Sequence, residues 1–276
     1  MAALQDIKAR IASVQSTLKI TSAMKMVASA KLHKTQNESL AFNEYSGRLS
    51  AMVSTLLTAT AGKVESPLMC AHEGKGRAIV VAMASDMSLC GAFNHNAVRL
   101  LEDTMKKLRE GGYERITVVP VGNKMVQAVA KLGYEVENSL TPDNLGDYLI
   151  SEYVEGKADE VLLLYHHFLS VGSQKPVAQQ LLPFAFEESG AYAVSDDYIF
   201  EPSAAELMNS VVPYCVKTKV RAAVLDNTIS EHAARMVAMQ TATDNAKELL
   251  DELKLTYNKR RQQAITDELA DIASNS

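Results

Sequence analysis

Tryptophan is absent from this chain, and glycine and aromatic residues are scarce. Only 13 of the 276 residues are glycine, and aromatic side chains make up 6% of the total. A ligand pocket rich in aromatic rings is therefore not expected. Methionine is plentiful instead, with 12 residues, and apolar residues reach 47%. This composition favours a globular protein with much helix and adaptable apolar packing.

Cysteine and long apolar runs are also scarce. The three cysteines, Cys70, Cys90 and Cys215, are odd in number and form no CxxC pair, which predicts reduced thiols in a cytosolic setting. No window approaches 18 continuous apolar residues, so we expect no membrane span. The first residues, MAALQDIKARIASVQ, resemble neither a signal peptide nor a transit peptide. We therefore expect a bacterial protein that reaches a membrane only through a partner.

The glycine pattern lacks the signatures of nucleotide binding. The sequence contains neither GxxxxGK[ST] nor a GxGxxG motif that follows a strand. Gly122-Asn-Lys124 follows an expected strand and begins an expected helix, but this arrangement alone is weak evidence for a phosphate site. We therefore expect no cofactor.

Two short motifs raise the question of catalysis or metal binding. Cys90 lies in the strand-to-helix turn SDMSLCGAFN, with Asp86 and His95 nearby in sequence, and could act as a nucleophile. A glycine-dependent turn around a small buried thiol explains the same residues, and no catalytic spacing is matched. His166 and His167 are adjacent in an expected strand, so they would point to opposite faces and share no metal. Neither motif therefore gives the sequence the signature of an enzyme.

The net charge of −5 is unevenly spread. Residues 1–57 hold seven basic and three acidic side chains, whereas residues 58–202 hold twelve basic and twenty acidic ones. A basic first segment beside an acidic middle segment suggests two different surroundings. Without aromatic interleaving or a recognised nucleic-acid fold, the basic segment does not predict nucleic-acid binding.

Both ends of the chain are expected to form very long helices. Residues 3–57 contain no proline and one glycine, and Ile7, Ile11, Val14 and Leu18 follow the 4-3-4 spacing of a heptad repeat. No proline or glycine follows Pro213, which is expected to open the second helix in its first turn after a short helical piece from Ser203. The apolar residues of this second helix are Met239, Ala242, Ala246, Leu249, Leu253, and later Ile265, Leu269 and Ile272. The two helices most simply pair as a long antiparallel coiled coil.

The middle of the chain has a different pattern. Buried strands are expected within 77–86, 112–122 and 160–168, separated by helices at 93–110, 123–132 and 144–156. Strands that alternate with helices are typical of a parallel α/β sheet, so we predict a Rossmann-like α/β domain. The predicted division is residues 1–60 for the first coiled-coil helix, 61–202 for the α/β domain and 203–276 for the second helix.

Polar residues occupy positions of the coiled coil where apolar ones are expected. These residues are Thr21, Lys25 and Lys31 on the first helix and Arg260, Arg261 and Gln262 on the second. A solvated coiled-coil end would explain them. A stiff shaft that a partner surrounds would also explain them, because Ala, Met and Thr pack without fixing a single interdigitation. On this hypothesis the segment Ser230–Asn245 packs tightly only on the N-terminal helix.

Several long segments resemble the gamma subunit of the F-type ATP synthase. The resemblance covers nearly the whole chain and is strongest in SEHAARMVAMQTATDNA and YNKRRQQAITDEL, between Ser230 and Leu269. IASVQSTLKITSAMKMVASAKLHKTQ near the start, the turn SDMSLCGAFN and the segment DYIFEPS also match, in the family's order. Departures are Met87-Ser88 in place of the usual Arg-Gly, Lys25 where many relatives carry an acid, and the ending DIASNS.

The resemblance implies a central-stalk rotor shaft without catalytic residues of its own. In that family the coiled coil fills the cavity of a hexamer of three alpha and three beta subunits. The α/β domain lies near the epsilon subunit and the c-ring of the membrane sector. Ion flow turns the ring and the shaft, and the asymmetric shaft cycles the beta subunits through ATP synthesis or hydrolysis. The implied location is peripheral, on the cytoplasmic face of the bacterial inner membrane.

The same resemblance implies individual partner contacts. The implied contacts with the hexamer are Met24, Lys25, Arg261, Gln262, Thr266 and Glu268. The c-ring is expected near Phe42–Arg48, and the epsilon subunit near Tyr192–Tyr198. Two other hypotheses remain open from the residues alone: a freestanding coiled-coil tether with an α/β head, and a small-molecule enzyme built on the α/β domain.

Overall fold

A computed structural model describes residues 2–59, 66–72, 76–137, 140–185 and 200–274. The contacts divide the chain into two compact units. The coiled-coil unit combines Met1–Ala30 with Arg235–Ser276, and the α/β unit comprises Lys31–Ala234. The predicted division at residues 60 and 202 follows changes of secondary structure and stays a prediction. Each unit is described by itself below.

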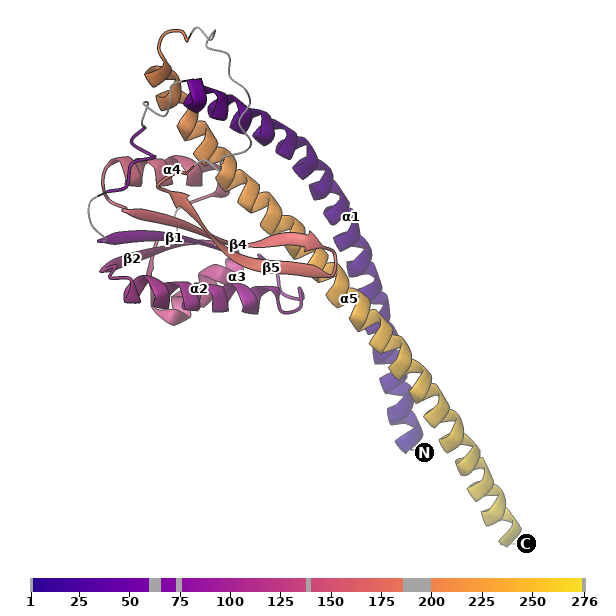
Figure 1. Ribbon diagram of the computed structural model, residues 1–276. Helices are drawn as coiled ribbons and strands as arrows, with labels where there is room; N and C mark the ends of the chain where they lie inside the picture. The colour runs from indigo at the N-terminus through magenta and orange to yellow at the C-terminus, as the bar shows by residue number, and fades with distance from the viewer. Residues whose placement is uncertain (1, 60–65, 73–75, 138–139, 186–199, 275–276) are drawn as a thin grey trace. The chain divides into compact units, whose positions relative to one another are not determined.

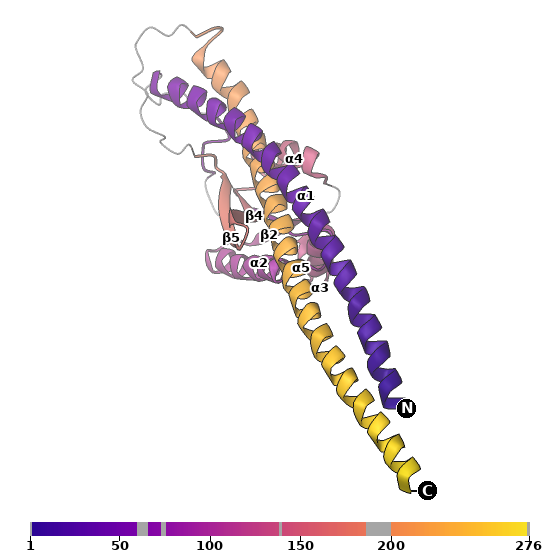
Figure 2. The ribbon, with the colours of Figure 1, turned by 90° about the vertical axis from the view of Figure 1, so that its right-hand side faces the viewer.

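The coiled-coil unit consists of the first part of helix α1 (Ala2–Ala59) and the last part of helix α5 (Ala204–Ser274). The two segments run antiparallel, with the N- and C-termini at the same end (Figures 1 and 2). The predicted positions Ile7, Ile11, Val14 and Leu18 are half-buried, and Ala28 is buried. The 4-3 spacing of apolar residues therefore forms the predicted coiled coil.

Helix α5 begins earlier than predicted and passes through Pro213 without a break. Ser203 caps its start, because the Ser203 hydroxyl accepts a hydrogen bond from the Glu206 N–H at 3.2 Å. A proline inside a helix removes one backbone hydrogen bond and costs roughly 3 kcal/mol. Met208, Val212 and Val216 are fully buried around this position. The prediction that Pro213 opens the helix was wrong because apolar packing holds the helix together on both sides of the proline.

The α/β unit contains a five-stranded sheet with the order β3-β2-β1-β4-β5. Its strands are β1 (Arg77–Met83), β2 (Arg115–Val121), β3 (Glu135–Val136), β4 (Glu160–Ser170) and β5 (Ser173–Leu182). The first four are parallel to one another, and β5 runs antiparallel to β4. The sheet is therefore mixed and not wholly parallel. The strands β1, β2 and β4 were predicted; β3 has two residues, and β5 carries Pro176, which is tolerated because β5 is an edge strand.

Helices cover both faces of this sheet (Figure 1). Helices α2 (Phe93–Glu110) and α3 (Asn123–Leu132) match the predicted ranges and pack on one face. Helix α4 (Pro142–Val154) begins two residues before the predicted start, with a proline in its first turn. The other face is covered by α4 with the first turns of α5 and the last turns of α1 within this unit. Burial on both faces explains why β1 is apolar at nearly every position.

Candidate functional site

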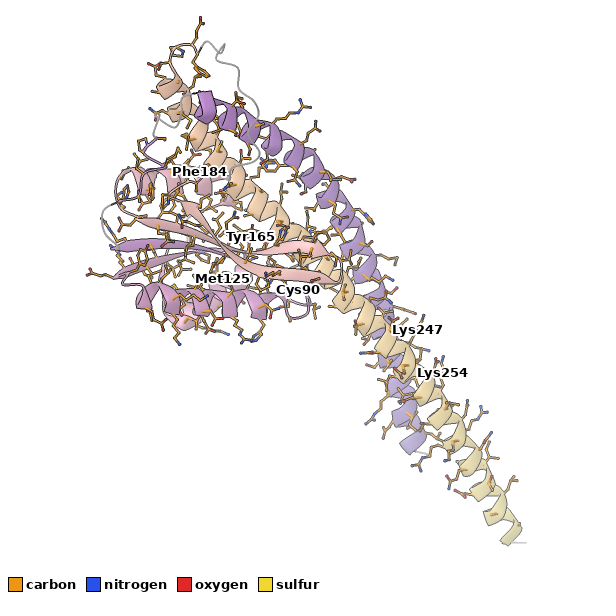
Figure 3. All side chains as sticks on the ribbon, viewed as in Figure 1. Cys90, Met125, Tyr165, Phe184, Lys247 and Lys254 are labelled. Carbon is orange, nitrogen blue, oxygen red and sulfur yellow. The ribbon has the colours of Figure 1, made fainter. Side chains whose placement is uncertain are left out.

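The turn between β1 and α2 is a structural turn. Cys90 is buried, and its thiol lies 3.7 Å from the Ser85 hydroxyl and 3.2 Å from the Asn94 amide nitrogen. Figure 3 places Cys90 beside the end of α2. The Asp86 carboxylate accepts a hydrogen bond from the Asn123 N–H, and His95 is exposed. The three side chains that could have formed a nucleophilic site therefore do not converge.

The start of α3 is occupied by a carboxylate. Asp86 Oδ1 accepts a hydrogen bond from the backbone N–H of Asn123 at 3.0 Å. Gly122 has φ +92°, and a Cβ atom there would lie 2.3 Å from the carbonyl oxygen of Ala84. The glycine is thus required for close packing of two backbones, and the aspartate already uses the positive end of the helix. A phosphate at Gly122-Asn-Lys124 would face this negative charge, which disfavours an anion site there.

His166 and His167 point to opposite faces of β4, as predicted. The His167 ring nitrogen Nδ1 lies 2.6 Å from the Asp226 carboxylate. The His166 ring is buried, stacks on Phe93 at 4.0 Å, and has no hydrogen-bond partner on either nitrogen among the described residues. Burial lowers the pKa of His166 to about 4. Within the part of the chain that the structure describes, no group of His, Cys, Asp and Glu side chains could hold a metal ion.

A shallow depression of about 340 Å³ lies at the amino ends of the parallel strands. Its charged side chains already have partners. Arg115 pairs with Glu135, and the Arg77 guanidinium donates to the Gly156 carbonyl at 2.7 Å. Lys157 pairs with Glu152. Charges that neutralise one another leave no unpaired group to recognise a substrate, so this depression is not a candidate active site.

The coiled-coil unit carries the remaining candidate residues, and a buried threonine pair defines its register. The Thr243 hydroxyl lies 2.9 Å from the Thr21 hydroxyl, and both side chains are buried. Because the helices are antiparallel, this pair sets the start of α1 opposite α5 near Gln263. The last turns of α5 therefore extend beyond α1, as both ribbon views show (Figures 1 and 2).

The six predicted partner-contact residues lie at two levels of this coiled coil. Met24 and Lys25 are half-buried on α1, close to Thr21. Arg261, Gln262 and Thr266 are exposed in the last turns of α5, where the Thr266 hydroxyl donates to the Gln262 carbonyl at 3.0 Å. Glu268 lies in α5, but its side chain is outside the described part. The structure thus forms two separate candidate surfaces.

The coiled-coil unit exposes large apolar side chains on both of its helices. Eight large apolar side chains in this unit are exposed. They are Ile20, Met26 and Val27 on α1, and Val237, Leu249, Leu255, Ile265 and Leu269 on α5. Exposed large apolar side chains grouped on one unit are typical of a surface that a partner covers.

One apolar position was predicted in the wrong place. Leu249 was expected to face α1, yet it is 45% exposed, and the adjacent Leu250 is half-buried instead. The buried positions follow Met239, Thr243, Ala246 and Leu250, whereas the prediction chose Ala242 and Leu249. Both patterns keep heptad spacing and share Met239 and Ala246, but the other positions of the buried pattern are Thr243 and Leu250, each one residue after the predicted Ala242 and Leu249.

The end of α5 is also positively charged. Lys259, Arg260 and Arg261 are consecutive and exposed, and the described part of the chain provides no ion-pair partner for them. Further back along α5, Lys254 pairs with Asp251 at 3.4 Å, and Figure 3 shows Lys247 and Lys254 projecting from the helix. The unpaired tract is available to an acidic partner.

The segment Ser230–Asn245 does not pack only on α1, contrary to the hypothesis. The Ser230 hydroxyl donates to the His166 carbonyl of β4 at 2.9 Å, inside the α/β unit. Asp226 and Asn227, one turn earlier, also bind β4. This contact was not predicted, although the polar run Asp226-Asn227-Thr228 in an otherwise apolar stretch of helix is a signal for it.

Comparison with known proteins identifies the family. A family model described as ATP synthase matches residues 3–276. The ATP synthase gamma chain of Bacteroides fragilis is 44% identical over 292 residues, which cover 100% of this chain and 99% of the relative. The chain belongs to the ATP synthase gamma family. The gamma chain of Flavobacterium johnsoniae is 36% identical, with 100% of this chain and 98% of that relative covered.

Solved structures share the fold of this gamma-family chain. A chain in the OSCP/F1/c-ring structure of the Euglena gracilis mitochondrial ATP synthase aligns with a TM-score of 0.64 at 20% identity, over 99% of this chain and 93% of that one. A central stalk/c-ring structure from Tetrahymena thermophila aligns with a TM-score of 0.55 at 22% identity, over 81% of this chain and 99% of that one. At these identities the likeness establishes the fold.

The two remaining predicted contact regions lie in different parts of the chain. Phe42–Arg48 lies in α1, where the Arg221 guanidinium covers the Phe42 ring at 5.7 Å and Arg48 pairs with Glu44 at 2.7 Å. Tyr192–Tyr198 lies outside the described residues. Among the helices that the structure describes, none has a stretch both long and apolar enough to cross a bilayer.

Proposed function

We propose that this chain is the central-stalk rotor shaft of an F-type ATP synthase. The coiled-coil unit turns inside a hexamer of alpha and beta subunits, and the α/β unit receives rotation from the c-ring. The chain forms no bond itself. It changes the relative stability of the beta-subunit conformations through contacts that differ around its circumference. It is a peripheral subunit at the cytoplasmic face of a bacterial inner membrane.

The apolar surface of the coiled-coil unit carries this proposal. Side chains such as Met26, Leu255 and Leu269 are more than half exposed, and leaving such groups in water costs free energy that an apolar sleeve recovers. A freestanding tether would instead have polar residues on its outer faces. These apolar side chains are distributed over both helices, so they offer apolar contact area without one deep interlocking anchor. A shaft that is tightly enclosed and still rotates requires an apolar surface without a deep interlocking anchor.

Two surfaces provide the polar contacts of the shaft. Arg261, Gln262, Thr266 and Glu268 lie on the last turns of α5, and the unpaired Lys259–Arg261 tract attracts an acidic loop of a beta subunit. Met24 and Lys25 form the second surface on α1. Because the surfaces lie at different levels, the hexamer contacts the shaft at two separate heights. The c-ring contacts the shaft near Phe42–Arg48, and the epsilon subunit contacts it near Tyr192–Tyr198.

Reconstitution tests this function. The chain is co-expressed with alpha and beta subunits from the same genome, and the product is weighed by native mass spectrometry. We expect three alpha, three beta and one copy of this chain, with ATPase activity that depends on the chain. Separate species, with alpha and beta subunits equally active without it, would refute the rotor function and favour a tether.

Two substitutions test the predicted contact between the last turns of α5 and the hexamer. Arg261→Ala with Gln262→Ala should weaken coupling to the hexamer by roughly 1–2 kcal/mol, the scale of an anchoring interface residue, and should lower the ATPase rate accordingly. Lys254→Ala is the matched control, because Lys254 lies on the same helix and already pairs with Asp251. Equal effects of the two changes would contradict a specific contact at Arg261 and Gln262.

A further inference from the structure

Strand β4 extends past the strand that pairs with it on one side. The parallel pairing of β1 with β4 ends at Ala82 and Leu164, and β1 itself ends at Met83, whereas β4 continues to Ser170. On the other side, β5 pairs with β4 up to Ser170. The residues of β4 after Leu164 therefore have one edge paired with β5, and at the other edge the described residues provide no neighbouring strand.

Three side chains of α5 occupy this vacant edge. The Asn227 side-chain oxygen accepts a hydrogen bond from the His166 N–H at 3.1 Å, and the Ser230 hydroxyl donates to the His166 carbonyl at 2.9 Å. Asp226 Oδ1 accepts from the Phe168 N–H at 2.8 Å. The backbone groups of residues two apart in a strand point to the same edge. Asp226, Asn227 and Ser230 thus replace the missing strand, and we call them the α5–β4 clamp.

The part of the clamp that binds His166 is buried. Ser230 and His166 are at most 1% exposed, and Asn227 is 5% exposed. Water cannot reach these backbone groups, so any displacement of α5 leaves them without partners. Apolar residues of α5 that pack on the sheet, such as Val212 and Val216, oppose separation of the helix from the sheet. Apolar contacts have no fixed direction, so they still allow the helix to slide along the sheet. The directional hydrogen bonds of the clamp fix both the axial position and the rotation of α5 against β4.

The position of the clamp along α5 gives it a mechanical role. Ser230 lies just before Arg235, where the coiled-coil unit begins, and α5 is one uninterrupted helix across that point. Torque that acts on the α/β unit has to be transmitted to α5 through contacts that precede the end of its packing on the sheet. The clamp is the polar contact closest to that exit among the described hydrogen bonds between α5 and the sheet.

We propose that the α5–β4 clamp is the joint through which the α/β unit transfers torque to the coiled-coil shaft. This inference rests on the rotor function proposed above. Asp226, Asn227 and Ser230 are positioning residues: they bind the backbone of β4, and they keep the helix from turning within the α/β unit under load. Loss of the clamp is expected to uncouple rotation from ATP chemistry without disturbing the hexamer's own hydrolysis.

The first measurement is amide hydrogen exchange on the assembled complex. Asp226→Ala and Asn227→Ala should speed exchange at the Phe168 and His166 amides, respectively, by about tenfold or more, because each change removes the acceptor of that amide. Thr228→Ala is the matched control, since the Thr228 hydroxyl donates to the Val224 carbonyl of its own helix. Unchanged exchange in the two clamp variants would show that the hydrogen bonds do not hold the helix.

The second measurement compares ion pumping with ATP hydrolysis in inverted membrane vesicles. We expect both clamp variants to hydrolyse ATP within about twofold of the unmodified complex, while the ions pumped per ATP against a gradient fall by at least about twofold. Asp226→Asn should restore coupling, because its amide oxygen still accepts from the Phe168 N–H. This rescue also excludes misfolding as the cause of the loss.

The outcomes separate the joint from the rotor function. Faster exchange with an unchanged pumping ratio would overturn the torque-bearing role of the clamp while leaving the rotor function intact. Vesicles whose ATPase and pumping do not require this chain at all would overturn the rotor function, whatever the variants do.

Discussion

At the scale of single residues, His166 is a buried base without a hydrogen-bond partner on its ring among the described residues. Its ring stacks on the Phe93 ring, and burial lowers its pKa from 6.5 to about 4. The imidazole is therefore neutral in the folded protein at neutral pH. The unfolded chain, with an ordinary pKa, binds a proton that the folded chain excludes between pH 6.5 and about 4.

This difference predicts acid-sensitive stability. The stability is complete above pH 6.5, falls as the pH drops through this window, and reaches its full loss, about 3 kcal/mol, below pH 4. His166→Phe should remove most of this loss. Denaturant unfolding of the isolated chain at pH 7 and pH 4.5 measures it, with His33→Gln as an exposed-histidine control. An unchanged pH dependence in His166→Phe would contradict the assignment.

Gly122 offers a second test at this scale. Its φ is +92°, and a Cβ atom at this position would lie 2.3 Å from the Ala84 carbonyl oxygen, which leaves no room for any other residue. Gly122→Ala should destabilise the chain by more than roughly 2 kcal/mol. Gly133→Ala, also at positive φ but with open space around it, should cost only about 1 kcal/mol. Equal losses in urea unfolding would show that backbone strain, and not the contact with Ala84, requires Gly122.

At the scale of elements, the buried threonines are a polar pair inside the apolar contact of α1 with α5. Thr243 hydrogen-bonds Thr21, and each hydroxyl also lies within bonding distance of a carbonyl of its own helix, Met239 and Leu18 respectively. A buried polar pair at a coiled-coil core position fixes register at some cost in stability. Here it fixes how α1 and α5 align within the coiled-coil unit.

Thr21→Val and Thr243→Val should therefore behave as a coupled pair. Each single change should cost about 1 kcal/mol, and the double change should cost less than the sum of the two, because both single changes remove the same Thr21–Thr243 hydrogen bond. Urea unfolding of the full chain measures the three variants, with exposed Thr241→Val as the control. Strictly additive losses would mean that the two hydroxyls do not depend on each other.

Adjacent leucines on α5 provide a sharper contrast. Leu250 is half-buried and Leu249 is 45% exposed. Leu250→Ala should cost about 1–2 kcal/mol in the isolated chain, whereas Leu249→Ala should cost less than about 0.5 kcal/mol. The proposed rotor function predicts that the order changes in the assembled complex, because the enclosing hexamer would contact the exposed Leu249 side chain. If Leu249→Ala is the more damaging change in the isolated chain, then Leu249 faces α1 as the sequence predicted, and Leu250 does not.

Much of the element structure was predictable because it depends on local pattern. Strands β1, β2 and β4 are continuous apolar runs, and α2 and α3 begin and end as their glycines and spacing indicate. Strand β5 was missed because SQKPVAQQLL is polar and contains a proline, and only its pairing with β4 makes it a strand. The predicted helix start at Pro213 was wrong because core packing of α5 outweighs the local helix-breaking effect of the proline.

At the scale of the whole molecule, the candidate site was predictable only in part. Met24, Lys25, Arg261, Gln262, Thr266 and Glu268 came from family resemblance, because a contact residue on a shaft has no chemical signature of its own. The residues alone predicted few large apolar anchors on α5, whereas the structure exposes leucine and isoleucine side chains such as Leu255, Ile265 and Leu269 on the coiled-coil unit. The α5–β4 clamp required the structure: the polar run Asp226-Asn227-Thr228 marks a contact on α5, but it does not identify the backbone groups of β4 as the partners.

The most direct test of the central claim is to watch this chain turn. Cys70 is exposed, whereas Cys90 and Cys215 are buried, so a bead can be attached selectively to the Cys70 thiol. The hexamer of the assembled complex is fixed to a surface, and ATP is added. The rotor function predicts stepwise rotation of the bead in one direction, at a rate that follows ATP hydrolysis. A bead that stays still or moves randomly, on complexes that hydrolyse ATP at the normal rate, would contradict it.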